Sequence, residues 1–194
     1  EHGSVSAETR ARVVAAAKQL GVPRVLPDVR HGLVRFDVVL ADSPTPYFRR
    51  LELALQRAAQ TLDSRILVHR HRVDPDDAPR IISALTRPGR QRNGLVVALH
   101  DSEAVRDALR GQIALGVPVV TLMSGIGDVP GLHYAGIDNL QAGRTAGHFI
   151  GRLARQAGRV LLLTNSLDYR AHAERLRGCA EVLIERHPQL QCSE

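Results

Sequence analysis

The sequence predicts an α/β fold in which helices flank a doubly wound parallel sheet. Three observations lead to this fold class. From residue 36 to the end, short apolar runs alternate with amphipathic helical patterns, the runs are rich in Val and Leu, and Gly or Pro often separates them. Such an alternation is typical of parallel strands joined by crossover helices. At 194 residues and 44% hydrophobic, the chain is long enough to bury the core of one or two domains.

The expected strands are the short apolar runs at Phe36–Ala41, Arg65–His69, Gly94–Leu99, Val117–Met123, His133–Ile137 and Val160–Thr164. The expected helices lie between most of them, at Tyr47–Thr61, Pro75–Thr86, Glu103–Leu115, Asn139–Gln156 and Arg170–Arg186. Sheets of this kind bind ligands in the loops at the carboxyl ends of their strands. We therefore look for site residues in the loops that begin near Asp42, Arg70, His100, Met123 and Thr164.

A separate helical pattern precedes the alternation. Ser6 can cap this helix, and Gly21 is typical of a helix end. Residues 22–35 hold Pro23 and Pro27 among basic side chains, so they are predicted to form a linker.

Composition limits the class of protein. The net charge of +6 invites a nucleic-acid interpretation, but Lys18 is the only lysine among 26 basic residues and the arginines are scattered. Charge alone therefore does not predict DNA binding. No apolar run approaches the roughly 18 residues of a membrane span and no leader pattern opens the chain, so we expect a soluble, cytoplasmic protein. Cys179 and Cys192 are expected to be reduced thiols, with a short local disulfide as the minor alternative.

The stretch from Tyr134 to Gly147 joins an apolar run to a long helical pattern. Asp138 stands directly before the helix and is predicted to be its N-cap. Small residues then recur at spacings of three and four, which places them on one face and lets the helix lie close to a neighbour. They are Ala142, Gly143, Ala146 and Gly147. Each interior glycine costs roughly 1 kcal/mol relative to alanine, so close packing or function is expected to offset it.

Three of the strand-end loops hold candidate ligand residues, each with a structural alternative. Tyr47 and Phe48 could stack on a sugar or a base, or could cover the core at a helix start. Asp101 could cap the next helix or accept hydrogen bonds from ligand hydroxyls. Arg175 or Arg177 could grip paired hydroxyls or a carboxylate, or could lie on a surface helix with partners four residues away.

Other motifs are excluded by their context. The glycine-rich run at residues 124–131 does not fit a dinucleotide loop, because Pro130 and a strand-like run follow it instead of a helix. His69 and His71 share a strand face but have no third ligand nearby in sequence, so no metal site is predicted. The chain contains no nucleophile elbow, HExxH motif or P-loop. We therefore expect no cofactor and no enzymatic activity.

Three motifs together resemble the LacI/GalR family of bacterial transcription regulators. They read Val5-Ser6-x-Glu8-Thr9-Arg10-x-Arg12-Val13, Gly136-Ile137-Asp138-Asn139-x-x-Ala142-Gly143 and Glu174-Arg175-Leu176-Arg177-Gly178. The first resembles the third helix of the family's helix-turn-helix headpiece. The second resembles the crossover between the two subdomains of the effector core, and the third the arginine-bearing helix that faces the effector. In this order and spacing, the resemblance extends from about Val5 to the end.

The resemblance implies a periplasmic-binding-protein-like core and four segments. Residues 1–21 would be the last headpiece helix and residues 22–35 the hinge. Residues 36–138 would form the N-terminal lobe of the effector core, and residues 139–194 the beginning of an incomplete C-terminal lobe. The chain is therefore expected to be a fragment, truncated at both ends.

The resemblance also implies effector-binding roles for individual residues. Tyr47 and Phe48 match an aromatic pair that sandwiches the effector, and Asp101 matches an acid that accepts sugar hydroxyls. Arg175 matches the arginine that grips the effector. Ser124 and Tyr169 fall at secondary positions of the cleft.

The implied partners are operator DNA and a small sugar or polyol, with the protein acting as a homodimer and without a membrane. Around the hinge, the residues expected to contact DNA are Arg24, Leu26, Val29 and Arg30, although Pro27 interrupts the stretch that forms the family's hinge helix. The implied function is transcription regulation of the repressor type, in which an effector between the lobes alters operator binding. The alternative is a periplasmic-type solute-binding protein for a small sugar.

Overall fold

The computed structural model describes residues 34–62, 66–87, 92–164 and 166–193, and ahead of them Thr9, Arg12, Val13, Ala16, Gln19 and Leu20. The chain divides into two compact units, Glu1–Leu33 and Val34–Glu194.

The described residues of the first unit agree with the expected N-terminal helix. All except Leu20 are helical, and the Leu20 N–H donates to the carbonyl of Ala16 at 3.0 Å. The expected hinge contacts lie outside the described residues and remain predictions: Arg24, Leu26, Val29 and Arg30.

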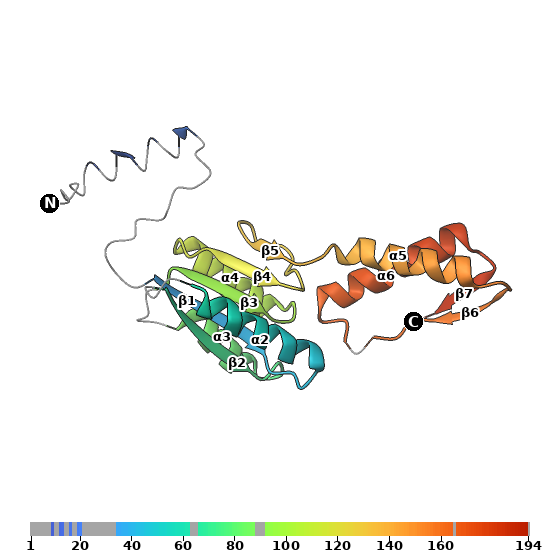
Figure 1. The fold of residues 1–194 in the computed structure, drawn as a ribbon, viewed down its shortest axis with the longest axis horizontal. Coiled ribbons are helices and arrows are strands. Elements are labelled where there is room, and N and C mark those ends of the chain that lie inside the picture. The colour runs from blue at the N-terminus through green and yellow to red at the C-terminus, as the bar shows by residue number, and fades with distance from the viewer. Residues whose placement is uncertain are drawn as a thin grey trace. The chain divides into compact units, whose positions relative to one another are not determined.

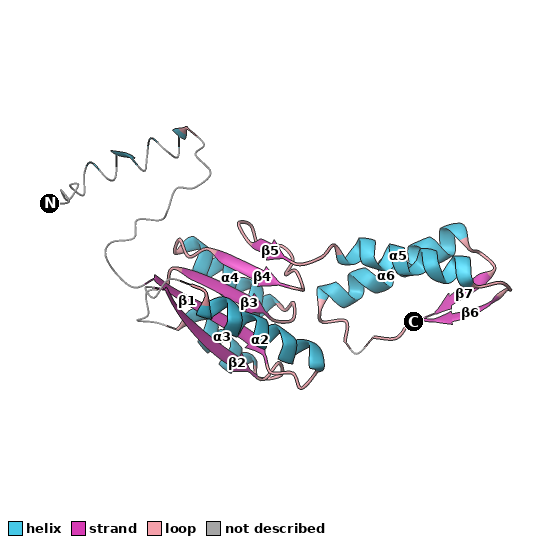
Figure 2. Ribbon diagram, in the orientation of Figure 1, coloured by secondary structure: helices cyan, strands magenta, loops and turns pink. Residues whose placement is uncertain are grey.

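In the second unit, a five-stranded sheet has the order β2-β1-β3-β4-β5, and every neighbouring pair is parallel (Figures 1 and 2). Its strands are β1 (Val34–Ala41), β2 (Ile66–Val73), β3 (Gly94–Ala98), β4 (Val119–Leu122) and β5 (His133–Ala135). In register, Val38 of β1 faces Arg70 of β2 on one side and Val96 of β3 on the other. The predicted α/β fold with a parallel sheet is confirmed.

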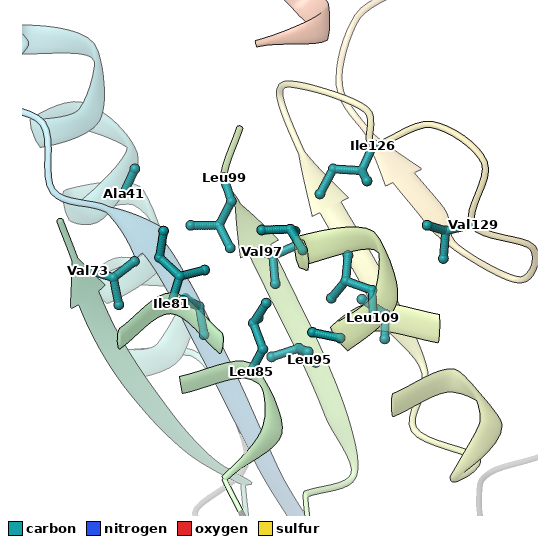
Figure 3. Close-up of a cluster of buried hydrophobic side chains, with 14 residues drawn as sticks. Ala41, Val73, Ile81, Leu85, Leu95, Val97, Leu99, Leu109, Ile126 and Val129 are labelled. Atoms are coloured by element: carbon teal, nitrogen blue, oxygen red, sulfur yellow. The ribbon is translucent and has the colours of Figure 1, made fainter. Parts of the chain in front are cut away.

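Helices cover both faces of this sheet because alternate side chains of its strands point to opposite faces. On one face, Val38 and Leu40 pack with α2 (Pro46–Gln60). On the other, Val39 belongs to a larger core formed with α3 (Ala78–Thr86) and α4 (Glu103–Ala114). Figure 3 shows this larger core, where side chains from both helices meet the strands.

A buried ion pair lies inside this sheet layer. The Nε of Arg92 lies 3.3 Å from the carboxylate of Asp37, and both side chains are almost fully buried. Arg92 Nη1 also donates to the carbonyl of Leu85 at 2.9 Å, at the end of α3. On the other side of the pair, His71 Nε2 lies 3.9 Å from Asp37 Oδ1. Arg92 therefore joins β1 to the last turn of α3.

After β5 the chain leaves the five-stranded sheet. Two helices, α5 (Asn139–Leu153) and α6 (Arg170–Arg186), accompany a parallel pair of strands, β6 (Gly158–Leu161) and β7 (Leu190–Ser193). We call residues 34–137 the five-stranded part and residues 139–193 the two-stranded part. A small core of Cys179, Leu183 and Leu190 holds the second of these together.

The glycines of α5 have the close neighbour that the sequence predicts. A Cβ at Gly143 would lie 2.1 Å from the carbonyl oxygen of Arg175, and one at Gly147 would lie 2.7 Å from that of Cys179. On α6, a Cβ at Gly178 would lie 2.2 Å from the carbonyl oxygen of Leu140. The backbones of α5 and α6 therefore touch where no side chain intervenes.

Several element boundaries differ from the expected ones. β7 was not expected at all, and β2 continues to Val73 instead of ending at His69. The helix expected from Pro75 begins at Ala78, because Asp77 accepts the Arg80 N–H as its N-cap. β5 and β6 end earlier than expected, and α5 stops at Leu153. Asp138 does cap α5, accepting the Gln141 N–H at 2.9 Å, as predicted.

Candidate functional site

Loops at the carboxyl ends of the strands meet the start of α6. The Asp101 N–H, after β3, donates to the carbonyl of Asp168 at 2.9 Å. The Ala171 N–H, in the first turn of α6, donates to Ser124 Oγ at 3.1 Å. These bonds join strand ends of the five-stranded part to the two-stranded part. Both bonds lie at the carboxyl ends of the strands, where parallel α/β folds bind ligands.

The aromatic pair after β1 divides between two environments. Tyr47 is 56% exposed at the start of α2, whereas Phe48 is half-buried and packs against the larger core. Their rings meet edge to face with centroids 6.2 Å apart. Phe48 therefore covers the core, as the structural alternative proposed, and Tyr47 presents its ring to solvent.

Asp101 does not cap the helix that follows it. Ser102 is the N-cap of α4 and accepts the Val105 N–H. Both oxygens of Asp101 are engaged instead: Oδ1 accepts from Arg106 Nε at 2.7 Å and Oδ2 from the Gly127 N–H at 3.1 Å. The carboxylate therefore holds the loop after β4 against α4. Capping by Asp101 is wrong, and its predicted contact with ligand hydroxyls would have to compete with these two bonds.

Ser124 is buried, at 3% exposure. Besides accepting the Ala171 N–H, its hydroxyl lies 3.4 Å from the carbonyl oxygen of Gly125 and can donate to it. An acceptor at the first turn of a helix satisfies an N–H group that has no partner within the helix. Ser124 thus anchors α6, and its effector role remains a prediction.

Tyr169 is the N-cap residue of α6 and lies between two histidines. Its ring centroid is 6.3 Å from that of His100 and 5.6 Å from that of His172. Burial raises the pKa of the Tyr169 phenol, and the carboxylates of Asp168 and Asp76 raise it further. Neither histidine was singled out from the sequence as a site residue, because His100 is distant from Tyr169 in sequence and the three-residue spacing to His172 does not by itself indicate a site.

Arg175 is held by a residue to which the sequence assigned no site role. Its Nη1 donates to Oδ1 of Asn139, which is 2% exposed at the start of α5. The amide nitrogen of Asn139 lies 3.1 Å from the hydroxyl of Tyr134 and 3.2 Å from the carbonyl oxygen of Met123. Burial raises the pKa of Tyr134, and the hydrogen bond with Asn139 partly offsets this rise. Asn139 belongs to the motif at residues 136–143 that resembles the family's crossover, but only the structure shows which groups Asn139 contacts.

The predicted residues line different pockets. Phe48 lines a groove of about 1170 Å³ between α2 and β2. Arg175 lines a pocket of about 450 Å³ along α5, α6 and β6, together with His172 and Thr164. The smaller volume falls in the range of small-molecule sites, roughly 300–1,000 Å³. Leucines of β6 and its continuation give this pocket an apolar wall.

The chemistry of these side chains suits binding. Arginine and tyrosine donate hydrogen bonds and an exposed aromatic ring can stack on an apolar sugar face. Within the described ranges, no three His, Cys, Asp or Glu side chains are grouped so as to hold a metal ion. None of the helices in the described part of the chain is long and apolar enough to cross a membrane.

The chain has the α/β fold of a parallel sheet with helices on both of its faces, and polar residues lie at the strand ends. The chain belongs to the family of the periplasmic binding protein domain, whose model matches residues 36–194. Curated protein sequences yield no match.

Solved structures share this fold. A solute-binding protein of an ABC transporter from Burkholderia multivorans is 15% identical, with a TM-score of 0.71 over 83% of this chain and 59% of that one. A protein named as a LacI transcriptional regulator from Bacteroides fragilis is 20% identical, with a TM-score of 0.70 over 82% and 59%. A solute-binding protein from Agrobacterium vitis, solved with bound D-fucose, is 13% identical, with a TM-score of 0.72 over 82% and 56%. This chain therefore spans less than two thirds of each, and the likeness concerns the fold.

Proposed function

We propose that the chain is part of a cytoplasmic transcription regulator of the LacI type, which binds operator DNA and responds to a small sugar or polyol. In this proposal the effector sits between two lobes, residues 36–138 and a lobe that begins at residue 139. Its binding shifts the protein between two conformations with different operator affinity. A homodimer would present two headpieces to the two halves of an operator.

The observation that carries the proposal is the helix ahead of the periplasmic binding protein domain. Its described residues are helical up to Gln19, and its sequence resembles the third headpiece helix of the LacI/GalR family. Val13 and Leu20 are 62% and 81% exposed. A helix this short is marginal alone in water, and an apolar stripe calls for a covering partner. The other helices of a headpiece would provide that cover.

The position of Arg175 supports a sugar or polyol as the effector. Its guanidinium carries five N–H donors in a planar fork, and neighbouring hydroxyls of a sugar match such a fork. Tyr47 offers an exposed ring for the apolar face of the same ligand. Solved relatives by fold were crystallised with D-fucose and with glycerol.

The test is operator binding by the full-length protein in gel mobility shifts, using its own upstream DNA with and without D-fucose, L-arabinose, D-ribose or glycerol. We expect specific binding that one of these ligands shifts at least tenfold. Arg175→Ala should remove the response to ligand and leave ligand-free DNA binding intact. The matched control is Arg177→Ala on the same helix, where the side chain is exposed and lies 3.6 Å from Glu181. Failure to bind DNA in every condition would contradict the proposal.

The second candidate is a solute-binding protein for a small sugar, favoured by the transporter proteins among the structural relatives. It shares the expected role of Arg175 but offers no role for the N-terminal helix. Sugar binding by the full-length protein without any DNA binding would favour this candidate.

A further inference from the structure

The chain from the end of β5 to the start of α5, residues 134–139, is folded into a tight, hydrogen-bonded loop. We call it the crossing segment. The hydroxyl of Tyr134 lies 2.9 Å from the carbonyl oxygen of Met123 and 2.7 Å from that of Ile137, and shares its proton between them. A Cβ at Gly136 would lie 2.2 Å from the same hydroxyl, so only glycine leaves room for the ring. The loop is therefore closed by Tyr134 onto the end of β4.

Asn139 connects this loop to α6. Its amide nitrogen faces the hydroxyl of Tyr134 and the carbonyl oxygens of Met123 and Ile137, at 3.1 to 3.3 Å. Its amide oxygen accepts from the guanidinium of Arg175. The two ends of the amide cannot be exchanged, because the nitrogen only donates and the oxygen only accepts. At 2% exposure, an Asn139 that lost the bond from Arg175 would be left with an unpaired buried amide oxygen.

Helix α5, which begins at Asn139, also constrains the backbone position of Arg175. The carbonyl oxygen of Arg175 lies against Gly143 of α5 with no room for a Cβ between them. α5 therefore fixes both ends of the arginine: Gly143 holds its backbone and Asn139 its guanidinium.

We propose that Asn139 is a positioning residue that couples the conformation of the crossing segment to the guanidinium of Arg175. The inference rests on the proposed function in that Arg175 is taken to contact the effector. A ligand that draws Arg175 away from Asn139, or holds it there, changes the stability of the bonds among Asn139, Tyr134 and Met123. By linkage, the crossing segment and the ligand then influence each other by the same factor.

The first test needs no ligand. Hydrogen exchange of peptides covering residues 134–142 is measured in the full-length protein and in two variants. Arg175→Ala should speed exchange there about tenfold, because the amide oxygen of Asn139 then loses the N–H group from which it accepts. Arg177→Ala, two residues further on and on the exposed side of α6, should leave it unchanged. Equal exchange in both variants would overturn the coupling.

The second test uses whichever of D-fucose, L-arabinose, D-ribose or glycerol binds the wild-type protein in calorimetric titrations. Asn139→Ala and Arg175→Ala should each raise the Kd at least tenfold. The double variant should be no weaker than Arg175→Ala alone, because Asn139 acts through that side chain. A merely structural Asn139 would give multiplicative effects, and that result would overturn the inference.

Two further outcomes separate this inference from the proposed function. Coupling in hydrogen exchange without binding of any sugar would keep the role of Asn139 and contradict the sugar-binding proposal. Sugar binding without coupling in hydrogen exchange would keep the sugar-binding proposal and contradict the role of Asn139. Should Asn139→Ala fail to fold, Arg175→Met replaces it, since methionine has a long side chain but no N–H group to donate to Asn139. Exchange of the crossing segment as slow as in wild type would then overturn the coupling.

Discussion

The five-stranded part and the two-stranded part of this protein use the same alternation of strands and helices but are held together differently. In the five-stranded part, branched apolar side chains fill the space between sheet and helices, as around Leu85 and Leu109. In the two-stranded part, α5 and α6 approach through glycines until their backbones touch. The core beside them is small, and Leu161 and Leu163 remain exposed.

The difference teaches how each part transmits a change. A core filled by side chains absorbs a small displacement by shifting rotamers and shape. A contact between two backbones has no side chains that could adjust in this way. We therefore expect a displacement of α6 to be passed on to α5. The candidate ligand residue Arg175 lies at the backbone contact between α5 and α6, whereas Phe48 packs against the core that is filled by side chains.

The largest expected effect comes from filling the glycine contact. Gly143→Val should destabilise the protein by about 4 kcal/mol or more, because the new side chain overlaps the carbonyl oxygen of Arg175. Urea unfolding followed by circular dichroism measures the change. Gly111→Ala is the control: a Cβ at Gly111 in α4 meets nothing within 4 Å. That variant should gain about 0.5–1 kcal/mol from helix propensity. Wild-type stability of Gly143→Val would break the comparison.

A smaller effect is expected from emptying the filled core. Leu109→Ala removes a side chain with 0% exposure and should cost about 2–5 kcal/mol through lost burial and a cavity. Leu115→Ala, at the end of the same helix with 77% exposure, should stay within about 0.5 kcal/mol of wild type. The same unfolding experiment compares the two. Similar losses in both variants would show that the core does not carry the stability of the five-stranded part.

The smallest effect concerns the junction between the two parts. Asp138→Ala removes the acceptor for the Gln141 N–H and should cost about 1 kcal/mol. Asp138→Asn should retain most of that stability, since asparagine caps helices about as well. Hydrogen exchange in the first turn of α5 distinguishes them. An unchanged rate in Asp138→Ala would mean that packing against α6 alone holds the helix start.

Local sequence patterns predicted most of the fold. The alternation of apolar runs and amphipathic helices gave every strand of the five-stranded sheet, and Asp138 was found as a cap because capping needs only neighbouring residues. The strand β7, which reads Leu190-Gln191-Cys192-Ser193, was missed because it is short and half polar. Only pairing with β6 makes this run a strand.

The candidate site could be predicted only in part. Its residues lie on loops whose partners are distant in sequence, such as Asp101 with Gly127 and Ser124 with Ala171. No local pattern states that a carboxylate or a hydroxyl is already engaged by such a partner. For the same reason the sequence could not show that Asn139 holds Arg175, 36 residues further along the chain.

The positions of the tyrosines have a practical consequence. The 194 residues contain three tyrosines and no tryptophan. Tyr47 begins α2 after β1, Tyr134 closes the crossing segment, and Tyr169 stands at the start of α6. The tyrosine emission of these residues therefore arises from the strand-end loops and the crossing segment, where the proposed effector and its coupling would act. Capture of a ligand can thus be followed optically, with no label attached and no core chromophore to mask the signal.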